Sequence, residues 1–274
     1  MQLGIFAKTF SATGALPVLQ AVKQAGYDVA QFNMACVGLP SMPETIAPSI
    51  AKEIATASST SGVTIAAVSG TYNMIHPDPA IRADGLARLA TIIRAAPLMG
   101  TRLVTLCTGT RDPRDQWKHH PGNSSSEAWR DLLEEMGKAL VLAGEYDVDL
   151  GIEPELANVV SSAEKARRLI DELKSPHIRI VLDPANLFEI ATPHESQSII
   201  AWAVDFLAGR IVMAHAKDRQ ANGEFTAAGS GVIDFPHFIR CLRSAEFDGP
   251  LVTHGLNEQE APRVAAFLRE VIAV

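Results

Sequence analysis

The strongest constraint on the fold is a regular alternation of short apolar runs with longer amphipathic stretches, which continues along the whole chain. Short apolar runs predict buried parallel strands, and the amphipathic stretches between them predict surface helices. The predicted strands cover residues 3–7, 28–33, 63–69, 103–107, 150–153, 178–183, 210–215 and 251–254. The predicted helices cover residues 16–25, 44–61, 79–99, 127–146, a stretch from 161 onward, 194–207, 235–244 and 258–272.

Eight strand–helix pairs without a linker predict an α/β fold in which residues 1–274 form a single domain, a (β/α)8 TIM barrel. The alternative is a doubly wound open sheet, which normally carries a glycine-rich phosphate-binding turn after its first strand. Residues 8–14 match that turn poorly, and the chain has no Walker-type sequence. Two local predictions accompany the barrel: a capping box formed by Ser161 and Glu164, and a glycine-containing loop over 219–231.

The composition narrows the class of protein. A chain of 274 residues with 47% hydrophobic content can bury a large core. Its net charge of −7 argues against a nucleic-acid partner. The sequence contains no run of about 18 apolar residues and no signal-like N-terminal segment, so we expect no membrane partner and a cytoplasmic location. Three scattered cysteines predict neither a disulfide framework nor a zinc cluster.

Four consecutive predicted strands end in a potential metal ligand. These residues are Glu153, Asp183, His215 and His254, and their spacings of 30, 32 and 39 residues each correspond to about one strand–helix unit. In a TIM barrel the C-terminal strand ends meet around the active site. Each residue alone has an ordinary structural explanation, such as a capped turn for Asp183. The four together predict a metal site, and their mixture of carboxylate and imidazole suits Mn²⁺, Zn²⁺, Fe²⁺ or Co²⁺ better than Ca²⁺.

The sequence resembles the xylose isomerase-like barrels, which include D-tagatose 3-epimerase, inosose dehydratase and endonuclease IV. The resemblance covers essentially the whole chain and is most specific at residues 151–155, 181–187 and 215–218. It implies a divalent metal ion, usually Mn²⁺ with Mg²⁺ among the alternatives, held by residues corresponding to Glu153, Asp183 and His215. The family has a fourth ligand, a glutamate that also transfers protons, where this chain has His254. Three readings follow: His254 performs both functions, it only coordinates the metal, or Glu258 reaches the site instead.

The resemblance implies a metal-dependent isomerase or epimerase that acts on a sugar or sugar phosphate through an enediolate. Glu153 and His254 would be the catalytic residues, moving protons on the two faces of the substrate. The first alternative is a lyase or dehydratase acting on a keto-sugar or keto-inositol. A non-catalytic sugar-binding protein and an endonuclease IV-like hydrolase are further alternatives. The expected partner is a small sugar-derived molecule, and the family implies a homo-oligomer.

Six polar or aromatic side chains near the predicted strand ends are candidates for substrate binding. All except Asn186 also have a structural reading, such as a turn, a helix cap, a packed loop residue or, for Lys217, a solvated ion pair with Asp218. The candidates are Asn73, His76, Trp117, Asn158, Asn186 and Lys217.

Overall fold

The computed structural model describes residues 1–273, and its chain alternates between strands and helices as predicted. The strands are β1 (Gln2–Phe6), β2 (Val29–Phe32), β3 (Thr64–Ser69), β4 (Leu103–Cys107), β5 (Asp149–Glu153), β6 (Ile178–Leu182), β7 (Ile211–Arg219), β8 (Phe225–Ala227) and β9 (Pro250–Thr253). The α-helices are α1 (Ala15–Gln24), α2 (Pro48–Ser61), α3 (Pro79–Ala95), α4 (Ser126–Tyr146), α5 (Ala163–Leu173), α6 (Pro193–Phe206), α7 (Phe235–Ser244) and α8 (Ala261–Ala273). Three short 3₁₀ segments at the barrel mouth are η1 (Ala7–Thr9), η2 (Met34–Val37) and η5 (Pro184–Asn186).

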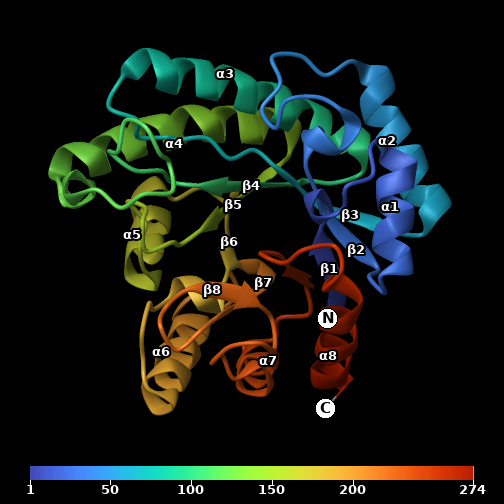
Figure 1. The fold of residues 1–274 in the computed structure, drawn as a ribbon. Helices are drawn as coiled ribbons and strands as arrows, with labels where there is room; N and C mark the ends of the chain where they lie inside the picture. Colours follow the sequence, from blue (N-terminus) through green and yellow to red (C-terminus); the bar gives the residue numbers. More distant parts are fainter. Residues whose placement is uncertain (274) are drawn as a thin grey trace.

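The strands form a closed parallel barrel, which confirms the predicted (β/α)8 fold. Their order is β6-β5-β4-β3-β2-β1-β9-β7, and pairing of β6 with β7 closes the ring. The helices surround the strands, and the two described ends of the chain lie near each other beside β1 and α8 (Figure 1). None of the helices within residues 1–273 combines the length and apolarity that a membrane span requires.

The apolar side chains of the strands form two separate layers, one outside and one inside the barrel, because successive side chains point to opposite faces. The larger layer packs the helices against the outside of the barrel. A smaller cluster comes from strands alone and consists of Ala67, Leu103, Val181, Met213 and Val252. Side chains two residues apart point to the same face of a strand. Three members of this inner cluster face the barrel interior two residues before a polar residue. The pairs are Val181 and Asp183, Met213 and His215, and Val252 and His254. The polar side chains therefore also point into the barrel, just above its apolar filling.

The structure differs from the sequence-based predictions around β7. The predicted loop over 219–231 is wrong in its first part, because β7 continues to Arg219 and pairs with the antiparallel strand β8. His215 consequently lies within β7 instead of at its end.

Two helix boundaries differ from the predicted ones because of prolines. Helix α2 begins at Pro48 instead of residue 44, and α3 ends at Ala95, where a 3₁₀ segment that contains Pro97 begins.

The predicted capping box at the start of α5 is also wrong. The N-cap is Ser162, one residue later, and its side chain accepts a hydrogen bond from the backbone N–H of Lys165. The Ser161 hydroxyl instead accepts a hydrogen bond from the Lys165 ammonium group at 3.0 Å. Ser161 therefore contacts the first turn of the helix without capping it.

Replacing Gly151 by alanine should destabilise the protein, because this residue of β5 faces the filled barrel interior. A methyl group at Gly151 would lie 2.8 Å from Val181 Cγ2 and 3.0 Å from Leu103 Cδ1. Overpacking of this kind costs about 1–3 kcal/mol in the free energy of unfolding, which urea denaturation measures. The matched control is Gly137→Ala in α4, where a methyl group meets nothing within 4 Å and should stabilise the helix by about 0.5–1 kcal/mol. Equal unfolding energies for the two variants would contradict the packing account.

Candidate metal centre

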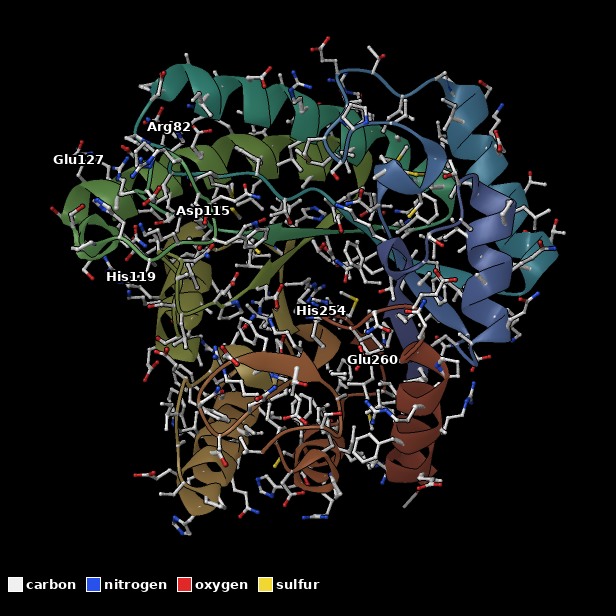
Figure 2. All side chains as sticks on the ribbon, in the orientation of Figure 1. Arg82, Asp115, His119, Glu127, His254 and Glu260 are labelled. Atoms are coloured by element: carbon white, nitrogen blue, oxygen red, sulfur yellow. The ribbon has the colours of Figure 1, made fainter. Side chains whose placement is uncertain are left out.

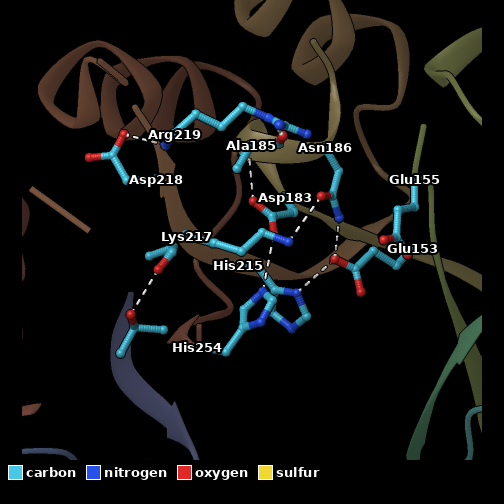
Figure 3. A network of polar contacts seen from close by, with 12 residues as sticks. Glu153, Glu155, Asp183, Ala185, Asn186, His215, Lys217, Asp218, Arg219 and His254 are labelled. Carbon is cyan, nitrogen blue, oxygen red and sulfur yellow. Dashed lines mark hydrogen bonds and ion pairs between the residues drawn. The ribbon is translucent and has the colours of Figure 1, made fainter. Parts of the chain in front are cut away.

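Four potential metal ligands converge at the C-terminal edge of the barrel (Figure 3). Glu153 ends β5, Asp183 follows β6, His215 lies within β7, and His254 follows β9. One donor atom from each residue lies within 4.8 Å of the other three donor atoms. Figure 2 shows the His254 side chain near the centre of the barrel, whereas Asp115 and His119 lie on the outer loop after β4. The structure therefore brings together all four residues predicted as metal ligands.

Gln31 on β2 orients His215. The Gln31 amide nitrogen donates to Ser69 Oγ at 3.2 Å and to Thr105 Oγ1 at 3.1 Å, which leaves its Oε1 facing His215 Nε2 at 2.8 Å. With the proton on Nε2, the Nδ1 lone pair of His215 faces Glu153 Oε1 at 3.1 Å. Two electron-rich atoms at this distance repel each other unless a proton or metal cation lies between them. The local hydrogen bonding thus favours cation binding at this point.

The donor set fits a divalent transition metal. Donors bound to one ion at about 2.1 Å lie about 3–4 Å from their neighbours. The observed separations are 3.1 Å for His215 Nδ1 and Glu153 Oε1, and 3.1 Å for His254 Nε2 and Asp183 Oδ2. Two carboxylates and two imidazoles suit Mn²⁺, Zn²⁺, Fe²⁺ or Co²⁺, whereas Ca²⁺ prefers oxygen ligands throughout. The residues present could therefore hold such an ion.

Lys217 and Asn186 link the two carboxylates of the cluster. The Lys217 ammonium group lies 3.3 Å from Asp183 Oδ2 and donates to Asn186 Oδ1 at 3.0 Å. The Asn186 amide in turn donates to Glu153 Oε1 at 2.8 Å. Burial alone would raise the pKa of Asp183, but Lys217 and then His254 hold that pKa well below its usual range. Burial would likewise lower the pKa of Lys217, but the surrounding carboxylates, Asp183 first, raise it, so the ion pair stays charged.

His254 has the electrostatic environment of a neutral ligand. Burial and the neighbouring His215 lower its pKa, although its contact with Asp183 opposes the shift. A neutral imidazole is the form that coordinates metals. The alternative in which Glu258 reaches the site is wrong, because its Oε2 accepts hydrogen bonds from the Ser11 backbone at 2.9 Å and hydroxyl at 2.8 Å.

A cavity of about 420 Å³ opens directly above the cluster. Three of the six predicted substrate-binding residues line it: Trp117, Asn186 and Lys217. Trp117, which is half-exposed, comes from the long loop after β4, so that its ring forms part of the cavity wall. The predicted solvated ion pair between Lys217 and Asp218 is wrong, because both side chains are buried and Lys217 pairs with Asp183.

The other three predicted substrate-binding residues lie outside this cavity and hold the loops around it. Asn73 makes two hydrogen bonds to the backbone of Thr110, which join the loops after β3 and β4. His76 contacts the backbone of Pro113 and of its own turn. Asn158 accepts a hydrogen bond from the Gly109 N–H. These buried side chains therefore fix the shape of the loops.

Glu155 also lines the cavity, although it is not among the site residues predicted from sequence. Burial, followed by the nearby charge of Glu153, raises the pKa of Glu155 to about 7. Its Oε2 lies 3.7 Å from the Cys107 sulfur and 3.5 Å from the Asn158 amide nitrogen. The Glu-Pro-Glu sequence was the available signal, because Glu155 lies two residues beyond Glu153 and residues at that spacing in an extended chain share a face.

Asp218 organises the glycine-containing loop after β8. Its carboxylate accepts hydrogen bonds from the backbone N–H groups of Arg219, Gly229, Gly231 and Ile233. Backbone N–H groups engaged in this way are not free to bind a phosphate. The loop therefore supports the end of β7 and offers no phosphate site of its own.

Replacing Gln31 by leucine should weaken Mn²⁺ binding about 10- to 100-fold, because His215 loses the acceptor that holds its Nε2 proton. Isothermal titration calorimetry measures the change in Kd. Gln24→Leu on the exposed surface of α1 is the matched control and should leave the Kd unchanged. A wild-type Kd for Gln31→Leu would show that the Gln31–His215 contact does not shape the metal site.

Known proteins share both the fold and parts of the sequence. Inosose dehydratase of Bacillus velezensis is 27% identical over 169 residues, which cover 55% of this chain and 53% of that protein. L-Ribulose-5-phosphate 3-epimerase of Shigella flexneri is 26% identical over 181 residues, which cover 65% of this chain and 58% of that protein. The matched segments thus span little more than half the length of these curated relatives.

Solved structures resemble the chain over nearly its whole length. The crystal structure of 3-keto-D-glucoside 4-epimerase from E. coli has a TM-score of 0.75 and 17% identity, and the match covers 98% of this chain and 99% of that one. A D-tagatose 3-epimerase-like protein has a TM-score of 0.79 and 15% identity, with coverage of 100% and 97%. At these identities the likeness establishes the fold. Residues 19–271 match the family model of the xylose isomerase-like TIM barrel, and the chain belongs to that family.

Proposed function

We propose that the protein is a divalent-metal-dependent epimerase or isomerase of a sugar or sugar phosphate. The observation that carries the proposal is the convergence of two carboxylates and two imidazoles within 4.8 Å at the floor of a 420 Å³ cavity. The curated relatives support the same class of substrate, since one is named as a sugar-phosphate epimerase and the other as an inosose dehydratase. Mn²⁺ is the ion we propose, held by Glu153, Asp183, His215 and His254.

Glu153 is the proposed base. Burial alone would raise the pKa of Glu153, but His215 holds that pKa below its usual range when a proton lies between its Nδ1 and Glu153 Oε1, so the carboxylate is ionised. Its Oε1 accepts a hydrogen bond from Asn186 and faces His215 Nδ1, while Oε2 has no hydrogen-bond partner within residues 1–273. Oε2 is therefore the atom that removes the proton next to the substrate carbonyl. A bound divalent cation would supply electrostatic stabilisation for the negative charge that develops on the substrate oxygens.

His254 is the proposed second proton-transfer residue. In the closed strand order, β6 and β7 separate its strand β9 from β5, so His254 and Glu153 approach the cavity from different sides. The Nε2 of His254 faces Asp183, whereas Nδ1 has no partner within residues 1–273 and can exchange a proton. Lys217, which also lines the cavity, provides positive charge for an enediolate oxygen.

Glu153→Gln should abolish exchange of the substrate α-proton, because the amide cannot accept it. The measurement is NMR of deuterium incorporation into D-fructose, D-tagatose, D-allulose and L-ribulose 5-phosphate in D₂O with Mn²⁺. We expect wild-type protein to exchange at least one of these, and Glu153→Gln to reduce that rate about 10²- to 10⁴-fold.

The control for that experiment is Glu145→Gln, an exposed residue of α4, which removes the same charge and should retain the wild-type exchange rate. Undiminished exchange by Glu153→Gln would refute the assignment of the base. Absence of exchange from every probe by the wild-type protein would count against an epimerase.

A dehydratase is the second candidate, and the placement of Glu155 favours it. Glu153 and His254 are the proposed proton-transfer residues, and the same cavity contains a further carboxyl group, Glu155, that this mechanism does not use. Loss of a β-hydroxyl as water requires an acid that protonates the departing oxygen, and Glu155 could fill that role. Mass spectrometry of the product distinguishes the two reactions, because dehydration lowers the mass by one water and epimerisation leaves it unchanged.

An endonuclease-type hydrolase receives less support. Within residues 1–273, one group of His, Cys, Asp and Glu side chains is arranged to hold a metal, and it contains four residues. The net charge of −7 also disfavours DNA binding.

A further inference from the structure

We propose that the cavity contains an anion-binding subsite formed by Lys8, Asn33 and Ser41, and that the substrate carries a terminal phosphate or carboxylate that binds there. The inference rests on the proposed function, because the metal cluster defines which end of the substrate reacts. Lys8 belongs to η1, Asn33 follows β2, and Ser41 follows η2. All three line the same cavity as Glu153.

The subsite lies across the cavity from the proposed base. In the closed ring, three strands separate β1 from β5 on either side, so the two strands stand opposite each other. Lys8 follows β1, whereas Glu153 ends β5. A substrate that places its carbonyl carbon near Glu153 would therefore direct its far end toward Lys8.

Lys8 is available for a ligand. Its ammonium group forms no ion pair within residues 1–273, in contrast to Lys23, which pairs with Asp28 at 2.8 Å, and to Lys217, which pairs with Asp183. The carboxylates that line the cavity, Glu153 and Glu155, both lie on the β5 side. The cavity is thus polarised, with acidic groups along one wall and an unpaired cation on the other.

Asn33 and Ser41 add neutral donors beside that cation. Asn33 is only 5% exposed, and its Oδ1 accepts the Ala35 N–H at 2.9 Å, which fixes the orientation of the amide. The Asn33 side chain lines the cavity, and its amide nitrogen donates to no acceptor within residues 1–273. Segment η1 contacts both β2 and η2, so Lys8 and Asn33 come from neighbouring segments at the same end of the barrel. Lys8, Asn33 and Ser41 thus offer an ammonium group, an amide N–H and a hydroxyl. Phosphate and carboxylate oxygens accept hydrogen bonds from all three types of donor.

The test compares three probes that differ in the terminal group: D-fructose, D-fructose 6-phosphate and 5-keto-D-gluconate. Calorimetry with and without Mn²⁺ measures each Kd for wild-type protein and for Lys8→Met. We expect at least one anionic sugar to bind the wild-type protein about tenfold more tightly than D-fructose, and Lys8→Met to remove that advantage. Preference for the phosphate or for the carboxylate identifies which anion the site takes.

Two further variants sharpen the comparison. Lys52→Met removes the same charge from the exposed face of α2 and should retain the wild-type preference. Asn33→Asp keeps the oxygen that accepts the Ala35 N–H but adds a negative charge, and should weaken binding of both anionic sugars by more than tenfold.

The subsite is overturned if neither anionic sugar binds wild-type protein more tightly than D-fructose, or if the advantage persists in Lys8→Met. This result is distinguishable from failure of the proposed function. Loss of Mn²⁺ binding by the wild-type protein would overturn the metal chemistry, whereas Lys8→Met should bind Mn²⁺ with the wild-type Kd because Lys8 lies outside the cluster.

Discussion

The site depends on how the protein accommodates two carboxylates in the wall of its barrel. Glu153 and Asp183 bring two negative charges into a largely buried place, and Lys217 balances one of them. An uncompensated buried charge costs several kcal/mol, so the arrangement favours a further cation. A divalent ion would leave the cluster with one net positive charge, which complements an enediolate. The charge balance, more than any single distance, connects the fold to the proposed chemistry.

The strand alternation explains why much of this could be predicted from sequence. Inward-facing Val181, Met213 and Val252 determine that Asp183, His215 and His254 also face inward, and this two-residue rule is visible in the sequence. The supporting contacts could not be predicted in the same way. Gln31 reaches His215 from a residue 184 positions away, and only the closed barrel brings these strands together. For the same reason the sequence could not show that Asn73, His76 and Asn158 hold loops beside the cavity.

His254 is the residue at which this chain departs from the pattern that the family resemblance implied. A neutral histidine in place of a glutamate keeps a donor next to Asp183 at 3.1 Å but removes a negative charge from the cluster. Glu155, on the loop after β5, places a carboxyl group in the same cavity. The carboxylates that line the cavity therefore lie on the β5 side, while Lys8 places a positive charge on the β1 side. This polarity gives the cavity a direction along which a substrate can be oriented.

Anomalous diffraction from crystals grown with Mn²⁺ tests the central claim most directly, because it locates the ion independently of any substrate. We expect one anomalous peak within bonding distance of Glu153, Asp183, His215 Nδ1 and His254 Nε2. Absence of a peak at this position, or a peak bound elsewhere on the chain, would contradict the account of both the charge balance and the reaction.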